Sequence, residues 1–133
     1  MNYLDFYKNE TILITGGAGA IGSNLTRKLA ETGAAKVIIL DDLSASYKWN
    51  IPNLPNVLFV EGSITNDIDL KRVFYEKPNY IFHLAAFFEN QNSEDYPEKD
   101  LMVSQLCTTK ILEYCLLLGG VKQFAYADSG NNI

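Results

Sequence analysis

Four glycines stand within seven positions directly after a short apolar run near the start of the chain. The stretch 11–24 reads TILITGGAGAIGSN. Glycine weakens both helices and strands, so a cluster of glycines at this point predicts a special backbone turn. We expect a strand at 11–15, a turn through the glycines, and a helix from residue 20 onward. This strand-turn-helix unit constrains the fold more than any other feature of the sequence.

The expected turn leads into the N-terminus of a helix, and that end of a helix suits a phosphate. Its unpaired N–H groups and partial positive charge attract anions. Gly16 would permit the tight turn, Gly19 would leave room for a pyrophosphate, and Gly22 would let the helix lie close to the strand. Glycine patterns of this kind also occur in ordinary turns, so the interpretation depends on what surrounds the pattern.

Short apolar runs alternate with segments of helical periodicity along the chain. Helical spacing and stop signals predict helices from residue 20 to Gly33, at 67–76 and at about 97–118. The strands between them are continuously apolar, which favours a parallel sheet covered on both faces. The expected fold class is therefore α/β, a doubly wound parallel sheet of the Rossmann type with about five strands in the order 3-2-1-4-5. The five apolar runs that predict these strands lie at 11–15, 36–40, 57–60, 80–84 and 123–127.

The length of the chain suits one hydrophobic core. With 133 residues, a single domain is expected. We assign residues 1–10 to an N-terminal extension and residues 11–133 to one dinucleotide-binding Rossmann domain, which we expect to be incomplete.

A carboxylate at the end of the second strand selects among dinucleotides. Asp41 follows the last glycine of the turn by about 20 residues, where a carboxylate would meet the adenosine ribose. It would accept hydrogen bonds from a free 2′-hydroxyl and repel a 2′-phosphate, which favours NAD over NADP. For Asp41, and more so for Asp42, a solvated strand end is the alternative interpretation. Methyltransferases also have an acidic residue after their second strand, but their glycine loop usually lacks the Thr-Gly-Gly-x-Gly-x-x-Gly form.

Charge and hydropathy argue against two kinds of partner. A net charge of −5 and a pI near 4.7 do not suit binding to nucleic acid, which needs a basic face. The most apolar long window, 101–121, is interrupted by Lys110 and Glu113 and is a poor membrane span. The first ten residues do not resemble a secretory signal, so we expect a cytoplasmic protein.

We interpret Cys107 and Cys115 as buried apolar residues.

Five further motifs follow the glycine turn in register. The six together are TGGAGAIGSNL at 15–25, LDDLS at 40–44, VEGSITND at 60–67, IFHLAA at 81–86, LMVSQLCTTKILEYC at 101–115 and VKQFAYADSG at 121–130. They resemble the extended short-chain dehydrogenase/reductase family, and within it the NAD-dependent nucleotide-sugar epimerases and dehydratases. The resemblance implies an enzyme that transiently oxidises a sugar hydroxyl by hydride transfer to NAD. It also implies a nucleotide-sugar substrate and a homodimer formed through the long helix.

The resemblance carries over a set of cofactor contacts, residue by residue. Three positions depart from the family, which commonly has Asp at Ser63, Asn at Ser104 and Gly at Cys107. With Ser63, the hydrogen bond to the adenine amino group would be weaker or replaced. The expected cofactor-binding residues are Gly16, Gly19 and Gly22 of the glycine turn, Ala20 and Ile21 at the pyrophosphate, Asp41, Asp42, Leu43 and Ser44 at the adenosine ribose, Ser63 and Ile64 at the adenine, Leu84, Ala85 and Ala86 toward the nicotinamide ribose, and Ser104 on the long helix.

The resemblance places only one catalytic residue in this chain. Ser129 matches the family's catalytic Ser or Thr, which holds the substrate oxygen by a hydrogen bond. The family also needs a Tyr-x-x-x-Lys pair, yet none of the eight tyrosines is followed by lysine four positions later. Family members are well over twice as long as this chain. We therefore expect the N-terminal portion of a longer enzyme, which by itself binds the cofactor without turnover.

Two other functions fit the same residues. One is a non-enzymatic dinucleotide sensor or scaffold, and the other is a reductase of the same family. His83 is the only histidine and invites a general-base role. Because it stands within IFHLAA at a strand end, we expect a structural role instead.

Overall fold

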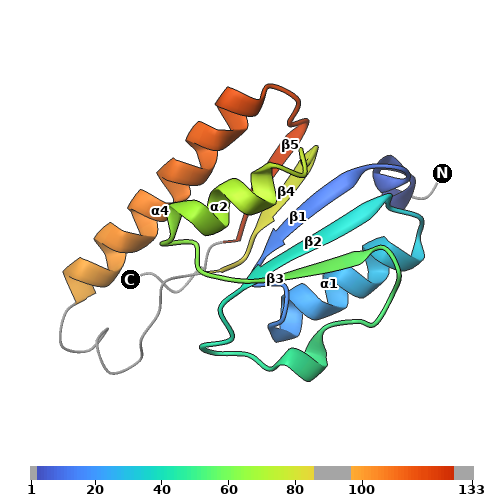
Figure 1. The fold of residues 1–133 in the computed structure, drawn as a ribbon, viewed down its shortest axis with the longest axis horizontal. Helices are drawn as coiled ribbons and strands as arrows, with labels where there is room; N and C mark the ends of the chain where they lie inside the picture. Colours follow the sequence, from blue (N-terminus) through green and yellow to red (C-terminus); the bar gives the residue numbers. More distant parts are fainter. Residues whose placement is uncertain (1–2, 86–96, 128–133) are drawn as a thin grey trace.

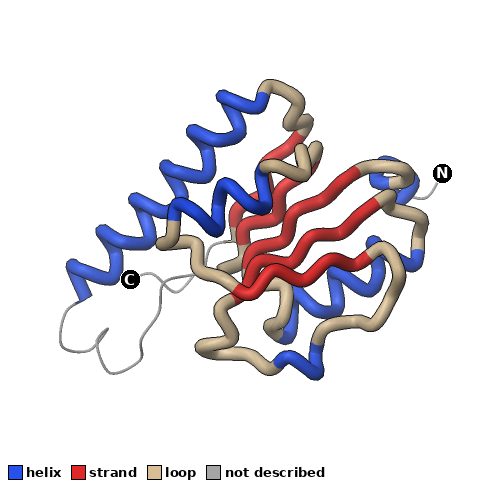
Figure 2. The backbone as a smooth tube through the Cα atoms, viewed as in Figure 1, coloured by secondary structure: helices blue, strands red, loops and turns tan. Residues whose placement is uncertain are grey.

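The computed structural model describes residues 3–85 and 97–127. Within them, five parallel strands form one sheet in the order β3-β2-β1-β4-β5 (Figure 1, Figure 2). This order confirms the doubly wound sheet expected from the alternation of apolar runs and helical segments. The strands are β1 (Thr11–Thr15), β2 (Lys36–Asp41), β3 (Val57–Glu61), β4 (Tyr80–His83) and β5 (Gln123–Tyr126).

The described residues also form three α-helices and two short 3-10 helices, the first of which precedes β1. The second α-helix is two residues shorter than predicted, because Tyr75 caps it and Lys77 adopts a positive φ of 57°. The helices are η1 (Tyr3–Tyr7), α1 (Ala20–Glu31), η2 (Lys48–Asn50), α2 (Asp67–Phe74) and α4 (Pro97–Leu118). None of the helices in the described part of the chain is long and apolar enough to cross a membrane.

The sheet separates two layers of helix, with α1 on one face and α2 and α4 on the other (Figure 1). Successive side chains of a strand point to opposite faces, so both faces of β1 can be buried. Ile12 and Ile14 pack with Leu29 of α1, whereas Leu13 packs with Ile111 of α4. The unbroken apolar run of β1 follows from this two-sided burial.

The segment that we assigned to an N-terminal extension packs against the sheet. Tyr7 meets the ring of Tyr80 edge-on, with ring centroids 4.9 Å apart, and lies 5.8 Å from Phe82. The Nζ of Lys122 lies 2.6 Å from an oxygen of Glu10, so the segment also reaches the start of β5. Burial raises the pKa of Tyr7. The segment thus covers the end of the sheet at which the parallel strands begin.

The helices α2 and α4 are joined by a polar contact on their outer side. The hydroxyl of Tyr114 donates to Asp67 at 2.5 Å, and the Nζ atoms of Lys71 and Lys110 each lie 3.3 Å from the same carboxylate. The hydrogen bond from Tyr114 lowers the pKa of Asp67 to about 2. The same bond raises the pKa of Tyr114 to about 12.

Candidate functional site

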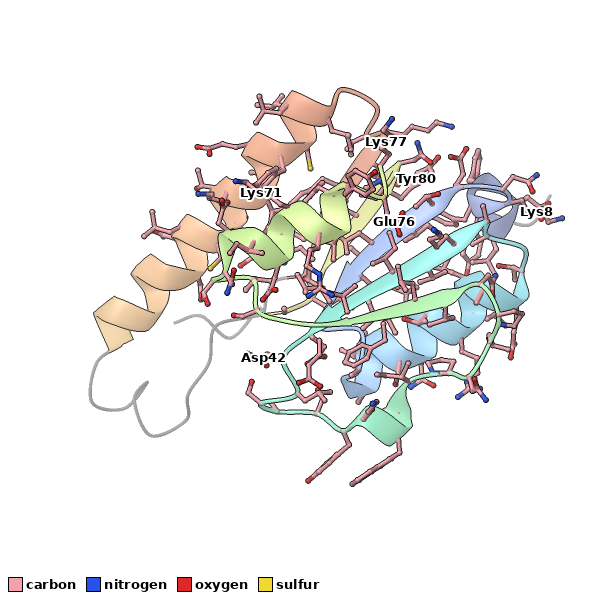
Figure 3. All side chains as sticks on the ribbon, in the orientation of Figure 1. Lys8, Asp42, Lys71, Glu76, Lys77 and Tyr80 are labelled. Carbon is pink, nitrogen blue, oxygen red and sulfur yellow. The ribbon has the colours of Figure 1, made fainter. Side chains whose placement is uncertain are left out.

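A cleft of about 370 Å³ lies at the carboxyl ends of the parallel strands. Figure 3 shows Asp42 at this end of β2, at the opposite end of the sheet from Tyr80, which begins β4. In open α/β sheets, ligands bind outside the carboxyl ends of the strands. The cleft is lined by Gly16, Gly19, Leu40, Asp41, Asp42, Ser44, Ala45, Ser46, Gly62, Ser63, Ile64, Leu84 and Ala85.

The turn between β1 and α1 depends on glycine at residue 16. Gly16 has a φ of 73°, and its N–H donates to the carbonyl of Leu40 at 2.8 Å. A Cβ on this residue would lie only 2.9 Å from the backbone nitrogen of Ala85. The turn therefore needs both the conformational freedom of glycine and its small size.

Two other glycines of the turn are needed for packing inside the protein. A Cβ on Gly22 would overlap the carbonyl oxygen of Gly16 and approach the Cα of Gly17 to 2.7 Å. A Cβ on Gly17 would approach the side chain of Ile39 to 2.7 Å. We expected Gly22 to bring the helix close to the strand. Its closest neighbours are in the turn itself, which is folded tightly against the start of α1.

Gly19 differs from these three glycines because the fold does not require it. Its φ of −74° and ψ of 177° are open to any residue. Of the residues that the structure describes, a Cβ there would meet only the carbonyl oxygen of Gly16, at an ordinary contact distance of 3.4 Å. The space beside Gly19 belongs to the cleft. The lack of a side chain at Gly19 therefore keeps the cleft open at the start of α1.

The N-terminus of α1 has no negative charge of its own to offset its dipole. The N-cap residue is Gly19, which offers no capping side chain, and the first turn holds no acidic residue. By contrast, the side chain of Asn66 caps α2, whose first turn contains Asp67 and Asp69. The first N–H groups of a helix lack partners within it. The start of α1 therefore presents donors and partial positive charge to the cleft.

Asp41 faces the same cleft from the end of β2 and is only 9% exposed. Its Oδ2 accepts a hydrogen bond from the N–H of Ala18 at 3.0 Å. Its Oδ1 accepts from the N–H of Leu43 at 2.8 Å and from the hydroxyl of Ser46 at 2.9 Å. Leu43 adopts a φ of 63° at this bend. Asp41 thus joins the glycine turn to the loop after β2.

The loop after β2 is attached to the glycine turn at a second point. The side-chain amide of Asn50 donates to the carbonyl of Ala18 at 3.1 Å. Asp42 is exposed and accepts a hydrogen bond from the N–H of Ser44 at 2.9 Å. Residues 42–50 therefore form a folded border on one side of the cleft.

The turn after β3 forms the opposite border. Asp69 of α2 accepts a hydrogen bond from the N–H of Ser63 at 3.0 Å, and the hydroxyls of Ser63 and Thr65 are 2.7 Å apart. The N–H of Gly62 donates to the carbonyl of Asp41 at 3.1 Å. These contacts hold Ser63 and Ile64 at the cleft.

The hydroxyl of Thr15, at the end of β1, holds two residues that line the cleft, Leu84 and Ala85. This oxygen accepts hydrogen bonds from the N–H groups of Leu84 and Ala85, both at 3.1 Å. It also lies 2.7 Å from Nδ1 of His83. The N–H of Leu84 lies equally close to the backbone carbonyl of Thr15, at 3.1 Å, and the contact between Thr15 and His83 joins the ends of β1 and β4.

The other ring nitrogen of His83 is bound to α4. Nε2 lies 3.2 Å from the hydroxyl of Thr108, which donates to the carbonyl of Ser104 at 3.0 Å. His83 is 2% exposed, and its burial lowers its pKa to about 4. A neutral, enclosed imidazole with both nitrogens bound to threonines agrees with the structural role expected from the sequence.

The structure brings most of the predicted cofactor contacts into one cleft. Nine of the fifteen residues line it: Gly16, Gly19, Asp41, Asp42, Ser44, Ser63, Ile64, Leu84 and Ala85. Gly22 lies behind the turn, Ala20 and Ile21 begin α1, Leu43 bends the loop, and Ser104 lies on α4. Ala86 and Ser129 lie outside the described residues.

Four residues that line the cleft were not predicted. They are Leu40, Ala45, Ser46 and Gly62. Each is adjacent in sequence to a predicted residue or lies within the same loop. A Cβ on Gly62 would approach the carboxylate of Asp69 to 2.6 Å, so this glycine could have been found from the tight turn between β3 and α2.

The model of the NAD-dependent epimerase/dehydratase family matches residues 12–132. The chain belongs to this family. Among curated members, it is 37% identical to a UDP-glucose 4-epimerase of Mycolicibacterium smegmatis over 125 residues, covering 91% of this chain and 39% of the relative. It is 38% identical to a dTDP-D-glucose 4,6-dehydratase of Dictyostelium discoideum over 123 residues, covering 86% of this chain and 28% of the relative.

Solved structures of family members have the same fold. The epimerase Mth375 of Methanothermobacter thermautotrophicus matches with a TM-score of 0.87 and 57% identity, over 96% of this chain and 37% of that one. The enzyme WbmF of Bordetella bronchiseptica, solved in complex with NAD+, matches with a TM-score of 0.79 and 33% identity, over 96% of this chain and 41% of that one. The chain thus spans well under half the length of these relatives.

Proposed function

We propose that this chain binds NAD in the cleft at the carboxyl ends of the strands. The observation that carries the proposal is the start of α1, which has no capping side chain and no acid, facing the same cleft as the carboxylate of Asp41. A dinucleotide offers a pyrophosphate and a ribose diol at a fixed separation. The cleft offers a donor-rich helix end and an acceptor on neighbouring strands.

The described residues suit the successive parts of this cofactor. The pyrophosphate would lie against the N–H groups at Ala20 and Ile21, beside the open position at Gly19. Asp41 would accept hydrogen bonds from the adenosine ribose, and the turn at Ile64 would lie against the adenine. Such an arrangement repels a 2′-phosphate through the charge of Asp41. When bound, NAD supplies the acceptor for a hydride.

We further propose that the intact protein is a nucleotide-sugar epimerase or dehydratase and that these 133 residues bind the cofactor without turnover. Relatives with these activities support the first statement. The second rests on the tyrosines, none of which has a lysine four positions later in this sequence. A lysine at that spacing is what the family uses to lower the pKa of its tyrosine.

Two properties of the intact protein belong to the same proposal. The exposed face of α4 supports a homodimer, because Leu106, Leu116 and Leu117 are 66%, 83% and 83% exposed. Large exposed apolar groups on one helix are typical of protein interfaces. A cytoplasmic location agrees with an enzyme that uses NAD and nucleotide sugars.

Isothermal titration with NAD, NADH and NADP tests the cofactor proposal. We expect NAD and NADH to bind and NADP to bind more weakly, and we expect no turnover of UDP-glucose. Asp41→Asn should weaken NAD binding and reduce the preference over NADP. Glu61→Gln is the matched control, because it removes the same charge from an exposed position at the end of β3. A folded chain that fails to bind NAD would contradict the proposal, and measurable turnover would contradict the claim of inactivity.

A further inference from the structure

The carboxylate of Asp41 has fewer open acceptor positions than a ribose diol requires. A carboxylate offers about four lone-pair positions on its two oxygens. Three of them are occupied by donors of the protein itself, namely the N–H of Ala18 on Oδ2 and the N–H of Leu43 and the hydroxyl of Ser46 on Oδ1. Among the residues that the structure describes, no further donor reaches this carboxylate, so one position remains, on Oδ2.

The three donors differ in how readily they can leave. The N–H groups of Ala18 and Leu43 belong to backbone that is held by the glycine turn and by the bend at φ 63°. The hydroxyl of Ser46 is a side chain that leaves by rotation about one bond, and Ser46 lines the cleft beside Asp41. The loop does not depend on it alone, because Asn50 holds the loop to Ala18 independently.

We propose that Ser46 is a specificity-determining residue whose hydroxyl competes with the adenosine ribose for Oδ1 of Asp41. This inference rests on the proposed function of the cleft. One ribose hydroxyl takes the open position on Oδ2, and the other replaces Ser46 on Oδ1. The hydroxyl on Oδ2 gains a hydrogen bond, whereas the hydroxyl on Oδ1 only exchanges one charge-assisted hydrogen bond for another. Ser46 therefore lowers the affinity for the dinucleotide and reduces the advantage that a complete diol has over a single hydroxyl.

The test is the affinity of Ser46→Ala for NAD, measured by isothermal titration beside the wild-type chain. Removing the competitor should strengthen NAD binding, by roughly three- to tenfold, because hydrogen bonds to charged groups are among the stronger ones. An NAD analogue that lacks both hydroxyls of the adenosine ribose should bind equally to the two proteins. Ser46→Thr keeps a hydroxyl and should bind NAD as the wild type does.

A matched control separates this effect from the loss of any serine hydroxyl. Ser23→Ala removes a hydroxyl that bonds the carbonyl of Ala20 within α1, and it should leave NAD affinity unchanged. Weaker or equal NAD binding by a folded Ser46→Ala protein would overturn the competition, as would an equal gain for the analogue that lacks the diol. Failure of the folded wild type to bind NAD would instead overturn the proposed function on which the inference rests.

Discussion

Replacing Gly22 and Gly19 by alanine, one at a time, separates a glycine that the fold needs from one that the ligand needs. The two residues are three positions apart at the start of the same helix. A Cβ on Gly22 would overlap backbone atoms of the glycine turn, which cannot rotate away. A Cβ on Gly19 would meet one atom of the described part of the chain, the carbonyl oxygen of Gly16, at 3.4 Å.

The expected magnitudes follow from these contacts. Inserting a methyl group into a packed region costs about 1–3 kcal/mol, and Gly22→Ala should be at the upper end because its neighbours are backbone. Alanine regains about 1 kcal/mol of helix propensity, which leaves a net loss of about 2 kcal/mol. For a domain of this size the loss lowers the melting temperature by roughly 7 °C. Gly19→Ala should change stability by no more than about 0.5 kcal/mol, but it should reduce NAD affinity by about tenfold or more.

Urea denaturation without ligand and isothermal titration with NAD measure the two effects separately. The two variants should show separate effects. Gly22→Ala should be less stable than the wild type, whereas Gly19→Ala should be as stable as the wild type but bind NAD poorly. Wild-type affinity in Gly19→Ala would refute the placement of the pyrophosphate at the start of α1. Unchanged stability in Gly22→Ala would refute the packing argument for the turn.

Three further predictions concern the stability of the described fold. The pKa of His83 is lowered to about 4 by burial, so the unfolded chain binds more protons below pH 6.5. Urea denaturation should therefore show a stability loss on the order of 3 kcal/mol between pH 6.5 and pH 4, and the loss should be much smaller in His83→Gln. The pKa of Asp67 is lowered to about 2, so its contribution is present above pH 4 and is lost as the pH falls toward 2. In Tyr114→Phe, a carboxyl titration followed by NMR should find this pKa raised toward its ordinary value; an unchanged pKa would contradict the hydrogen bond. Asn66→Ala should cost about 1 kcal/mol in urea denaturation, because it removes the N-cap of α2, and no loss would contradict the capping role.

The sheet and its strand order could be predicted from the sequence because burial acts on both faces of each strand. Ile12, Leu13 and Ile14 read as one apolar run, and the structure distributes them between the two helical layers. The glycine turn could be predicted because Gly16 and Gly22 stand where only glycine fits. These are local requirements, and local patterns express them directly.

The finer structure of the cleft could not be predicted, because it depends on contacts between distant residues. Ser46 reaches Asp41 only because the loop after β2 bends at Leu43 and is held by Asn50 to the glycine turn. The packing of Tyr7 against the sheet likewise depends on where β4 lies, more than 70 residues later in the sequence. No periodicity or motif in the sequence encodes such contacts.

A crystal structure of the chain grown with NAD tests the central claim most directly. The account predicts the pyrophosphate against the first N–H groups of α1 beside Gly19, with the adenosine ribose on the carboxylate of Asp41. NAD bound elsewhere on the protein, or the cleft filled by its own side chains in the presence of saturating NAD, would contradict it.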